Sequence, residues 1–173
     1  MDLYDEELLK FWAALEQHQV EYILVGGYAV NLHGYQRFTG DLDIWLNDTL
    51  ENRKKLRNVF IACDMGNFPM IETMQFVPGW TEFYLNNSLK LDIMTEMKGL
   101  EDFKFHECYE MAFVAEIDDI KIPFLHLSQL ITNKRVVDRP KDRDDVTALE
   151  QIQQIHDQEN DRNNDPEPPS FSR

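Results

Sequence analysis

The chain has 173 residues, of which 43% are hydrophobic and 12% aromatic, and its formal charge at neutral pH is -15. This length and composition predict one folded domain over residues 1–156 and exclude a largely disordered protein. Residues 157–173 are polar and contain prolines, so we expect a disordered acidic tail there. No apolar run is long enough to cross a membrane, and the two distant cysteines, Cys63 and Cys108, are typical of a reduced compartment. We therefore expect a cytoplasmic protein with no membrane partner.

The negative charge limits the partners that the protein can bind. Proteins bind nucleic acids largely through basic residues that displace counterions from the phosphates. An acidic surface repels the same phosphates. We therefore expect no broad binding to DNA, and an RNA partner would need a local basic patch.

The N-terminal part predicts a helix, a strand and a second helix. From Leu3 to His18 apolar residues recur at helical spacing, which indicates an amphipathic helix covering a sheet. Tyr22–Val25 is a short apolar strand that ends at Gly26-Gly27. Such a pair lets a phosphate approach backbone N–H groups, although a plain tight turn is its commoner use. The helix predicted next, over Tyr28–Gly34, would point the positive end of its dipole at the same place.

A loop and a second strand then bring four polar side chains together. Asp41 and Asp43 lie on a predicted strand, Asp41–Leu46, whose alternation puts both carboxylates on one face, about 6.6 Å apart. Two such carboxylates repel each other, and a hard divalent cation relieves the repulsion. In the preceding loop, Arg37 offers a forked donor for phosphate oxygens and Thr39 offers a hydroxyl. The sequence therefore predicts a magnesium and phosphate site here.

The next helix carries the densest basic cluster of the chain. Thr49 is a suitable N-cap for a helix that runs to about Ala62. The residues expected on its outward face are Arg53, Lys54, Lys55 and Arg57. Two interpretations stay open for this cluster: a solvated helix face, which is the commoner case, and a patch for an acidic acceptor.

A hairpin over Thr81–Met94 supplies a third carboxylate. Its second strand places Leu89, Leu91 and Ile93 on one face and Asp92 on the other. Aspartate is depleted in strands, so its place between two apolar residues calls for an explanation. An ordinary exposed aspartate is one interpretation, and a partner for the two earlier carboxylates is the other.

The C-terminal part predicts further helices around another hairpin. We expect a helix over Leu100–Met111, a hairpin over Val114–Phe124, a helix over Leu127–Val137 and a last helix from Asp142 to about Ile155. The link between the last two helices is highly charged. Most such charge is solvated, but Lys134 and Lys141 could reach a triphosphate.

These residues resemble a known family. The run GGYAVNLHGYQRFTGDLDIW is similar to the active-site signature of the polymerase-beta-like nucleotidyltransferase superfamily, in which a glycine turn and a helix precede D-x-D and a later strand, here LKLDI, adds a third aspartate. The R-x-T before D-x-D and the later R-P-K-D-x-x-D resemble small bacterial nucleotidyltransferases, including toxins of abortive-infection toxin–antitoxin systems. The resemblance extends from about Tyr22 to Leu149.

The resemblance implies a fold and an activity. The fold would be α+β, with a mixed central β-sheet flanked by helices, and the activity would be transfer of a nucleoside monophosphate from an NTP such as ATP, with release of pyrophosphate. Two magnesium ions would be held by Asp41, Asp43 and Asp92. The residues that would hold or neutralise the phosphates are Gly26, Gly27, Arg37, Thr39, Lys134 and Lys141.

One departure from the family pattern keeps other functions open. Many members carry serine after the first glycine, where this chain has Gly27. The alternatives are a catalytically inactive module that binds a nucleotide or a partner, and a toxin–antitoxin component acting on tRNA. The acceptor of an active enzyme could be RNA, a protein or a small molecule.

Overall fold

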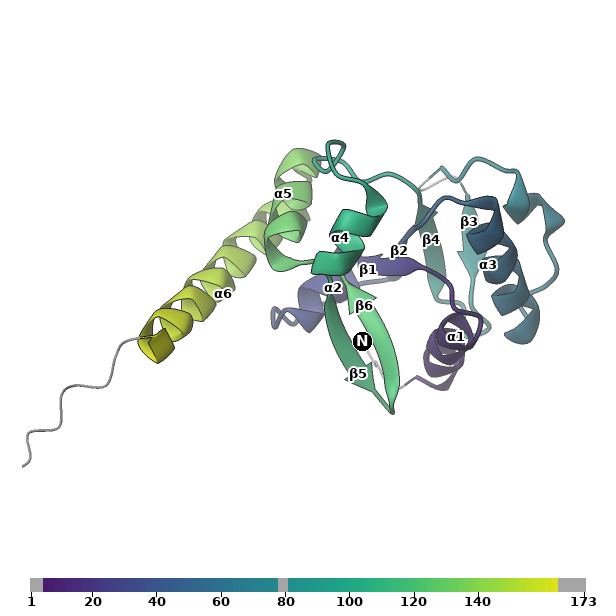
Figure 1. Ribbon diagram of the computed structural model, residues 1–173, viewed down its shortest axis with the longest axis horizontal. Coiled ribbons are helices and arrows are strands. Elements are labelled where there is room, and N and C mark those ends of the chain that lie inside the picture. Colours follow the sequence, from purple (N-terminus) through teal and green to yellow (C-terminus); the bar gives the residue numbers. More distant parts are fainter. Residues whose placement is uncertain (1–4, 78–80, 165–173) are drawn as a thin grey trace, which may run out of the picture.

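The computed structural model describes residues 5–77 and 81–164 of the chain (Figure 1). Helices and strands are interspersed along the sequence. In chain order the elements are α1 (Glu6–Gln17), β1 (Tyr22–Val25), α2 (Gly26–Leu32), β2 (Asp41–Leu46), α3 (Leu50–Ala62), the 3-10 helix η1 (Pro69–Glu72), β3 (Glu82–Tyr84), β4 (Lys90–Met94), α4 (Phe105–Met111), β5 (Phe113–Ile117), β6 (Ile120–Phe124), α5 (Leu127–Val137) and α6 (Pro140–Asn164).

The strands form one mixed sheet in the order β3-β4-β2-β1-β6-β5. β2 is parallel to β4 and β1 is parallel to β6, whereas the other neighbouring pairs are antiparallel. In Figure 1, α1 and α3 lie together toward one end of the molecule, and α5 and α6 pack against each other toward the other end. The predicted α+β fold with a mixed central sheet is confirmed.

Burial explains why the central strands lie where they do. All four residues of β1 are buried, as expected for a strand in the middle of a sheet that is covered on both faces. In β2, Leu42 and Ile44 are fully buried, whereas Asp41 and Asp43 on the alternate face are only partly buried. One face of the strand therefore packs in the hydrophobic core, and the other face carries the two carboxylates.

Helix α1 has the apolar face that the sequence predicts. Its inward residues Leu8, Phe11, Trp12 and Leu15 are all completely buried. The helix begins at Glu6 because the Asp5 side chain accepts hydrogen bonds from the backbone N–H groups of Glu7 and Leu8. The first residues of the predicted segment, including Leu3, lie outside the described residues.

Helix α2 begins earlier than the sequence pattern indicates. Gly26 and Gly27 form its first turn, whereas we predict a separate turn followed by a helix from Tyr28. Gly26 has a φ of 64°, a conformation that glycine adopts without steric cost. The strand therefore passes into the helix with no intervening loop.

The basic cluster on α3 differs from the prediction. Thr49 caps the helix as expected, but Arg53, predicted to face outward, is only 9% exposed. Arg53 donates hydrogen bonds to two backbone carbonyls, those of Ile71 and Met74. Its guanidinium thus anchors the segment that follows α3, which reduces the basic patch considered for an acidic acceptor.

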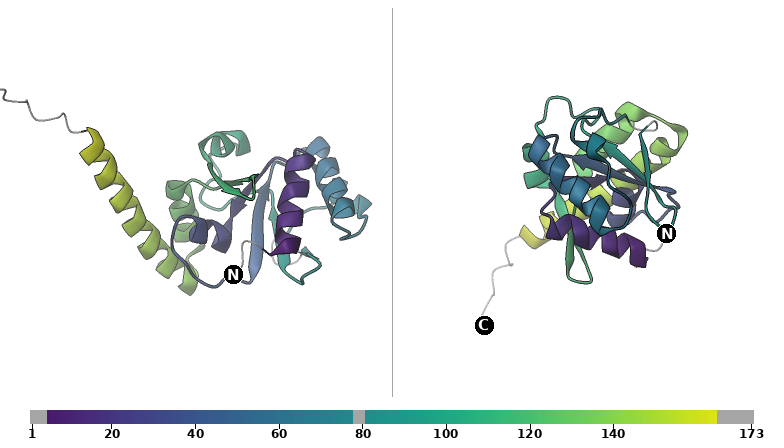
Figure 2. Two further views of the ribbon diagram at one scale, coloured as in Figure 1. Left: turned by 90° about the horizontal axis from the view of Figure 1, so that it is seen from below. Right: turned by 90° about the vertical axis from the view of Figure 1, so that its right-hand side faces the viewer.

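Helix α6 is longer than predicted. We expect the last helix to end near Ile155 and a disordered tail from residue 157, but the helix continues to Asn164 and extends away from the rest of the molecule (Figure 2). No glycine or proline occurs between Lys141 and Asn164, so no helix-breaking residue interrupts this helix. Residues 165–173 of the predicted tail lie outside the described residues. Within the described ranges, no helix is long and apolar enough to cross a membrane.

Candidate active site

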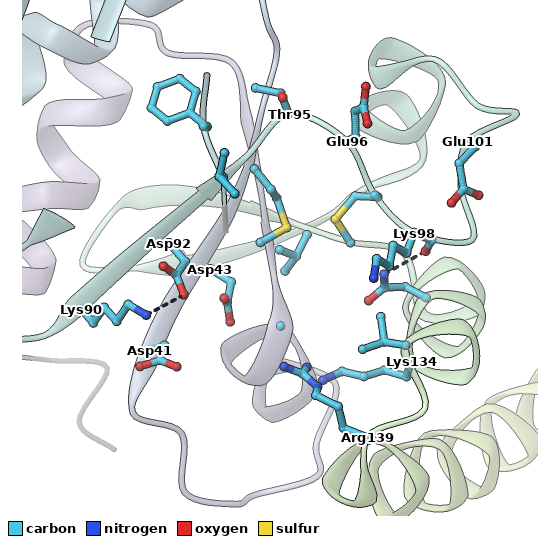
Figure 3. A pocket seen from close by; sticks show the side chains of 18 of the residues that line it. Asp41, Asp43, Lys90, Asp92, Thr95, Glu96, Lys98, Glu101, Lys134 and Arg139 are labelled. Carbon is cyan, nitrogen blue, oxygen red and sulfur yellow. Dashed lines mark hydrogen bonds and ion pairs between the residues drawn. The ribbon is translucent and has the colours of Figure 1, made fainter. Parts of the chain in front are cut away.

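Strands β2 and β4 place three aspartates on one wall of an open cavity of about 690 Å³. Asp43 is the register partner of Asp92, and Asp41 is the partner of Lys90 in the same parallel pair. Partners in neighbouring strands point to the same face of a sheet, so the carboxylates project together (Figure 3). The third carboxylate that the sequence predicts on β4 therefore lies beside the first two.

Asp43 has a raised pKa within this acidic wall. Burial and the negative charges of Asp92 and Asp41 raise the pKa of Asp43 from 3.8 to about 6. The positive charges of Lys134 and Arg139, which line the same cavity, act in the opposite direction. A site that raises the pKa of a carboxyl group in this way gains by binding a further cation.

Asp92 and Lys90 form an ion pair within this wall. Asp92 is 7% exposed, and its Oδ2 lies 3.3 Å from Lys90 Nζ. The ammonium also lies 3.2 Å from Glu82 Oε1 on β3, where Glu82 is the register partner of Asp92. Asp92 Oδ1 is buried and accepts no hydrogen bond from the described residues. A buried carboxylate oxygen without a donor is a vacant ligand for a cation.

The two glycines make room for side chains of this site. A Cβ atom on Gly26 would lie 2.0 Å from Asp43 Oδ2, and one on Gly27 would lie 2.3 Å from Thr39 Oγ1. Because both distances are far below contact distance, a side chain at either position would displace its neighbour. Gly27 therefore provides the space in which the Thr39 hydroxyl lies.

The loop residues Arg37 and Thr39 bind other parts of the chain. Arg37 donates to both carboxylate oxygens of Asp145 on α6, from Nε at 2.5 Å and Nη2 at 2.8 Å. Thr39 Oγ1 donates to the backbone carbonyl of Asp41 at 3.3 Å. Neither residue lines the cavity. In this structure the predicted phosphate clamp ties the loop before β2 to the last helix.

The predicted lysines differ in their positions. Lys134 lines the cavity but is 2% exposed, and its Nζ lies 3.0 Å from Asp142 Oδ1 and 2.9 Å from Asp145 Oδ2. Burial raises the pKa of Asp142, but hydrogen bonds from Arg139 and Lys134 outweigh it and lower that pKa to about 2. Lys141 is exposed and is not among the residues that line the cavity.

Comparison with known proteins supports the fold. No protein-family model and no curated protein matches the chain. Among solved structures, the chain is similar to the lincosamide antibiotic adenylyltransferase LnuA bound to lincomycin, with 19% identity, a TM-score of 0.56, and coverage of 88% of this chain and 99% of that one. It is similar to ANT(2")-Ia in complex with adenylyl-2"-tobramycin, with 16% identity, a TM-score of 0.52, and coverage of 90% and 95%.

A third similar structure is an antigenic nucleotidyltransferase-like protein from Paracoccidioides brasiliensis, with 14% identity, a TM-score of 0.53, and coverage of 83% of this chain and 74% of that one. The chain has the nucleotidyltransferase fold. The family resemblance of its sequence motifs and its tertiary structure therefore lead to the same fold.

Within this nucleotidyltransferase fold, the acidic wall fits a divalent cation by its chemistry. Asp43 has a raised pKa, and Asp92 has a buried oxygen without a donor. The side chains are not gathered into a ready-made site: across residues 5–77 and 81–164, no three His, Cys, Asp or Glu side chains form a group that could hold a metal ion. Binding by three of these side chains therefore requires some of them to rotate.

The cavity also contains residues that sequence reasoning missed. Arg139 lines the cavity and donates a hydrogen bond from Nε to Asp142 at 2.7 Å. The residue of the R-P-K-D motif predicted to reach the phosphates is Lys141, not Arg139. Pro140 begins α6, so Arg139 lies just before the helix and its backbone N–H donates to Asp142. The Asp142 side chain thus holds Arg139 at the cavity. A signal for Lys90 was present in the sequence, because residues two apart on a strand, here Lys90 and Asp92, point to the same face.

Proposed function

We propose that the protein is a metal-dependent nucleotidyltransferase that transfers a nucleoside monophosphate from an NTP to an acceptor and releases pyrophosphate. The observation that carries the proposal is the register of β2 and β4, which sets Asp43 beside Asp92 on a cavity wall. Lys134 and Arg139 line the same cavity and supply positive charge near the carboxylates. Carboxylates for metal and cations for phosphate are the requirements of phosphoryl transfer.

Each group has a role that follows from its position. Asp41, Asp43 and Asp92 would hold two magnesium ions, which when bound neutralise phosphate charge and favour ionisation of the acceptor hydroxyl. Arg139 is the better placed of the two cations for a phosphate, because its side chain is 54% exposed and that of Lys134 is 2% exposed. Lys134 would act mainly by fixing the start of α6 and, through Asp142, the position of Arg139.

The backbone around Gly26 and Gly27 completes the phosphate side of the site. Gly26 lines the cavity next to Asp43. Glycine has no side chain of its own, so a phosphate can approach its backbone N–H group more closely than that of any other residue. We propose that Arg37 and Thr39 act on the phosphates through the loop that they hold in place.

The acceptor is proposed only by class. Two of the solved structures named above contain small molecules, lincomycin in one and adenylyl-2"-tobramycin in the other. The cavity extends beyond the aspartates along the loop after β4 and along α5, where Glu96, Glu101 and Asn133 line it. We propose that the acceptor hydroxyl enters from this side, whether it belongs to a small molecule, a protein or an RNA end.

Nucleotide binding tests the proposal without knowledge of the acceptor. Calorimetric titrations with ATP, CTP, GTP and UTP would be run with magnesium and with EDTA. We expect magnesium-dependent binding of at least one nucleotide, which the Asp41→Asn/Asp43→Asn double variant loses. Asp119→Asn is the matched control, because Asp119 lies in the β5–β6 turn at a φ of 65°, which asparagine tolerates. Equal nucleotide binding by all three proteins would contradict the proposal.

A second candidate function is a module that binds a nucleotide or partner without turnover, for example within a toxin–antitoxin pair. The observation that favours it is that two residues predicted to bind phosphate, Arg37 and Lys134, both form ion pairs with Asp145 instead. Tight nucleotide binding with no pyrophosphate release across a panel of acceptors would support this candidate. Pyrophosphate release that depends on Asp92 would exclude it.

A further inference from the structure

Lys90 lies among the carboxylates of the acidic wall. Its Nζ is 3.3 Å from Asp92 Oδ2 (Figure 3). The same Nζ is 3.2 Å from Glu82 Oε1, and the Lys90 side chain is 20% exposed. The register of the sheet determines these neighbours, because Glu82 is the partner of Asp92 in β3–β4 and Asp41 is the partner of Lys90 in β2–β4. A cation therefore already occupies one oxygen of a carboxylate that would bind metal.

The ion pair provides a partner for only one of the two carboxylate oxygens of Asp92. Oδ2 faces Lys90, while Oδ1 is buried and accepts no hydrogen bond from the described residues. A divalent cation at Asp92 would bring two positive charges within a few ångströms of the ammonium. Such charges repel strongly at a partly buried site, so the ammonium must move when the metal binds.

We propose, on the basis of the function above, that Lys90 is a resident counter-ion of the metal site that disfavours binding of free metal and favours binding of a metal–nucleotide complex. Free metal adds positive charge beside Lys90. A metal–triphosphate complex is net negative, so it offers the displaced ammonium a new partner. Lys90 would thus couple occupancy of the metal site to the presence of the nucleotide.

A purely structural role for Lys90 makes a different prediction. If the lysine only joined β3 to β4, its loss would lower stability and leave metal affinity unchanged. Lys98 provides the matched control, because it lines the same cavity and carries the same charge but has no ion pair among the described residues. Lys98→Gln therefore reports the general effect of removing one positive charge from the cavity.

The test measures Mn²⁺ binding by calorimetry and by electron paramagnetic resonance. It uses Mn²⁺ alone and Mn²⁺ with an ATP analogue that has a methylene bridge between the α- and β-phosphates, so no transfer occurs. We expect Lys90→Gln to bind free Mn²⁺ about tenfold more tightly than the unmodified protein, as for loss of a competing charged hydrogen bond. Lys98→Gln should change the affinity by about twofold at most, as expected for a screened charge. Lys90→Arg should behave like the unmodified protein.

The outcomes separate this inference from the proposed function. Equal effects of Lys90→Gln and Lys98→Gln, or no effect of either, would overturn the role of Lys90. The role of Lys90 would also be overturned if Lys90→Gln bound the Mn²⁺–analogue complex more tightly by the same factor as it bound free Mn²⁺. Lys90 would then not couple metal binding to the nucleotide. If the unmodified protein bound Mn²⁺ but no nucleotide analogue, the proposed function would fail while the competition at Asp92 could still be measured. A thermal melt of each variant would show that it is folded.

Discussion

Replacing Asp43 with asparagine should stabilise the protein while removing its metal site. The pKa of Asp43 is raised from 3.8 to about 6, first by burial and then by the charges of Asp92 and Asp41. The folded state therefore binds this proton more tightly than the unfolded state does. Ionisation of Asp43 costs stability as the pH rises from about 4 to 6, and the full cost is present above that window.

The size of the effect follows from the same pKa values. A difference between 3.8 and about 6 corresponds to about 3 kcal/mol at pH 7. At pH 4 it corresponds to only about 0.5 kcal/mol, because Asp43 is then protonated in the folded state and still partly protonated in the unfolded state. Asparagine resembles the neutral carboxyl in shape, so Asp43→Asn should gain about these amounts. Functional sites commonly carry such a cost.

Urea denaturation followed by circular dichroism measures this gain. The free energy of unfolding would be determined at pH 7 and pH 4, in EDTA so that no divalent cation stabilises the unmodified protein. Asp119→Asn, in the β5–β6 turn, should change stability by less than about 0.5 kcal/mol at both pH values. Destabilisation by Asp43→Asn, or an equal gain at both pH values, would refute the account of the acidic wall.

Three further predictions concern the groups that hold the site together. Asp145→Asn should lower the free energy of unfolding by about 3 kcal/mol in urea melts, because it breaks buried ion pairs with Arg37 and Lys134. The control variant Asp144→Asn, at an exposed neighbouring position, should have little effect. In acid titrations, the stability contributed by Asp142 should be present above pH 4 and be lost as the pH falls toward its folded-state pKa of about 2; a transition unchanged in Asp142→Asn would contradict this. Gly26→Ala should cost about 1–2 kcal/mol from its positive φ alone and weaken metal binding by displacing Asp43, and calorimetry showing unchanged metal affinity would count against this geometry.

Much of the fold could be predicted because its signals are local. The bounds of β1, β2 and α5 agree with the segments predicted from apolar patterning, and β5 and β6 form the hairpin predicted over Val114–Phe124. Strand alternation likewise predicted that Asp41 and Asp43 share a face. These features depend on periods of two and 3.6 residues and on turn chemistry, which neighbouring residues determine.

Other expectations were wrong or incomplete where distant segments meet. Arg53 has the spacing of an exposed residue, but carbonyls that follow α3 draw it into the interior. Arg37 has the composition of a phosphate ligand, but Asp145, 108 residues further on, takes up its guanidinium in this structure. Neither partner can be identified from the local pattern around the arginine.

The sequence by itself determined that three aspartates would lie on the polar faces of two strands, because side-chain direction in a strand follows from the backbone alone. Only the tertiary structure decided that β4 lies parallel to β2 with Asp92 beside Asp43, that Lys90 enters the same wall, and that Arg139 lines the cavity. Strand register is a non-local property. It is set by the packing of the whole buried face, since a shift of one residue would bury the carboxylates and expose the apolar side chains.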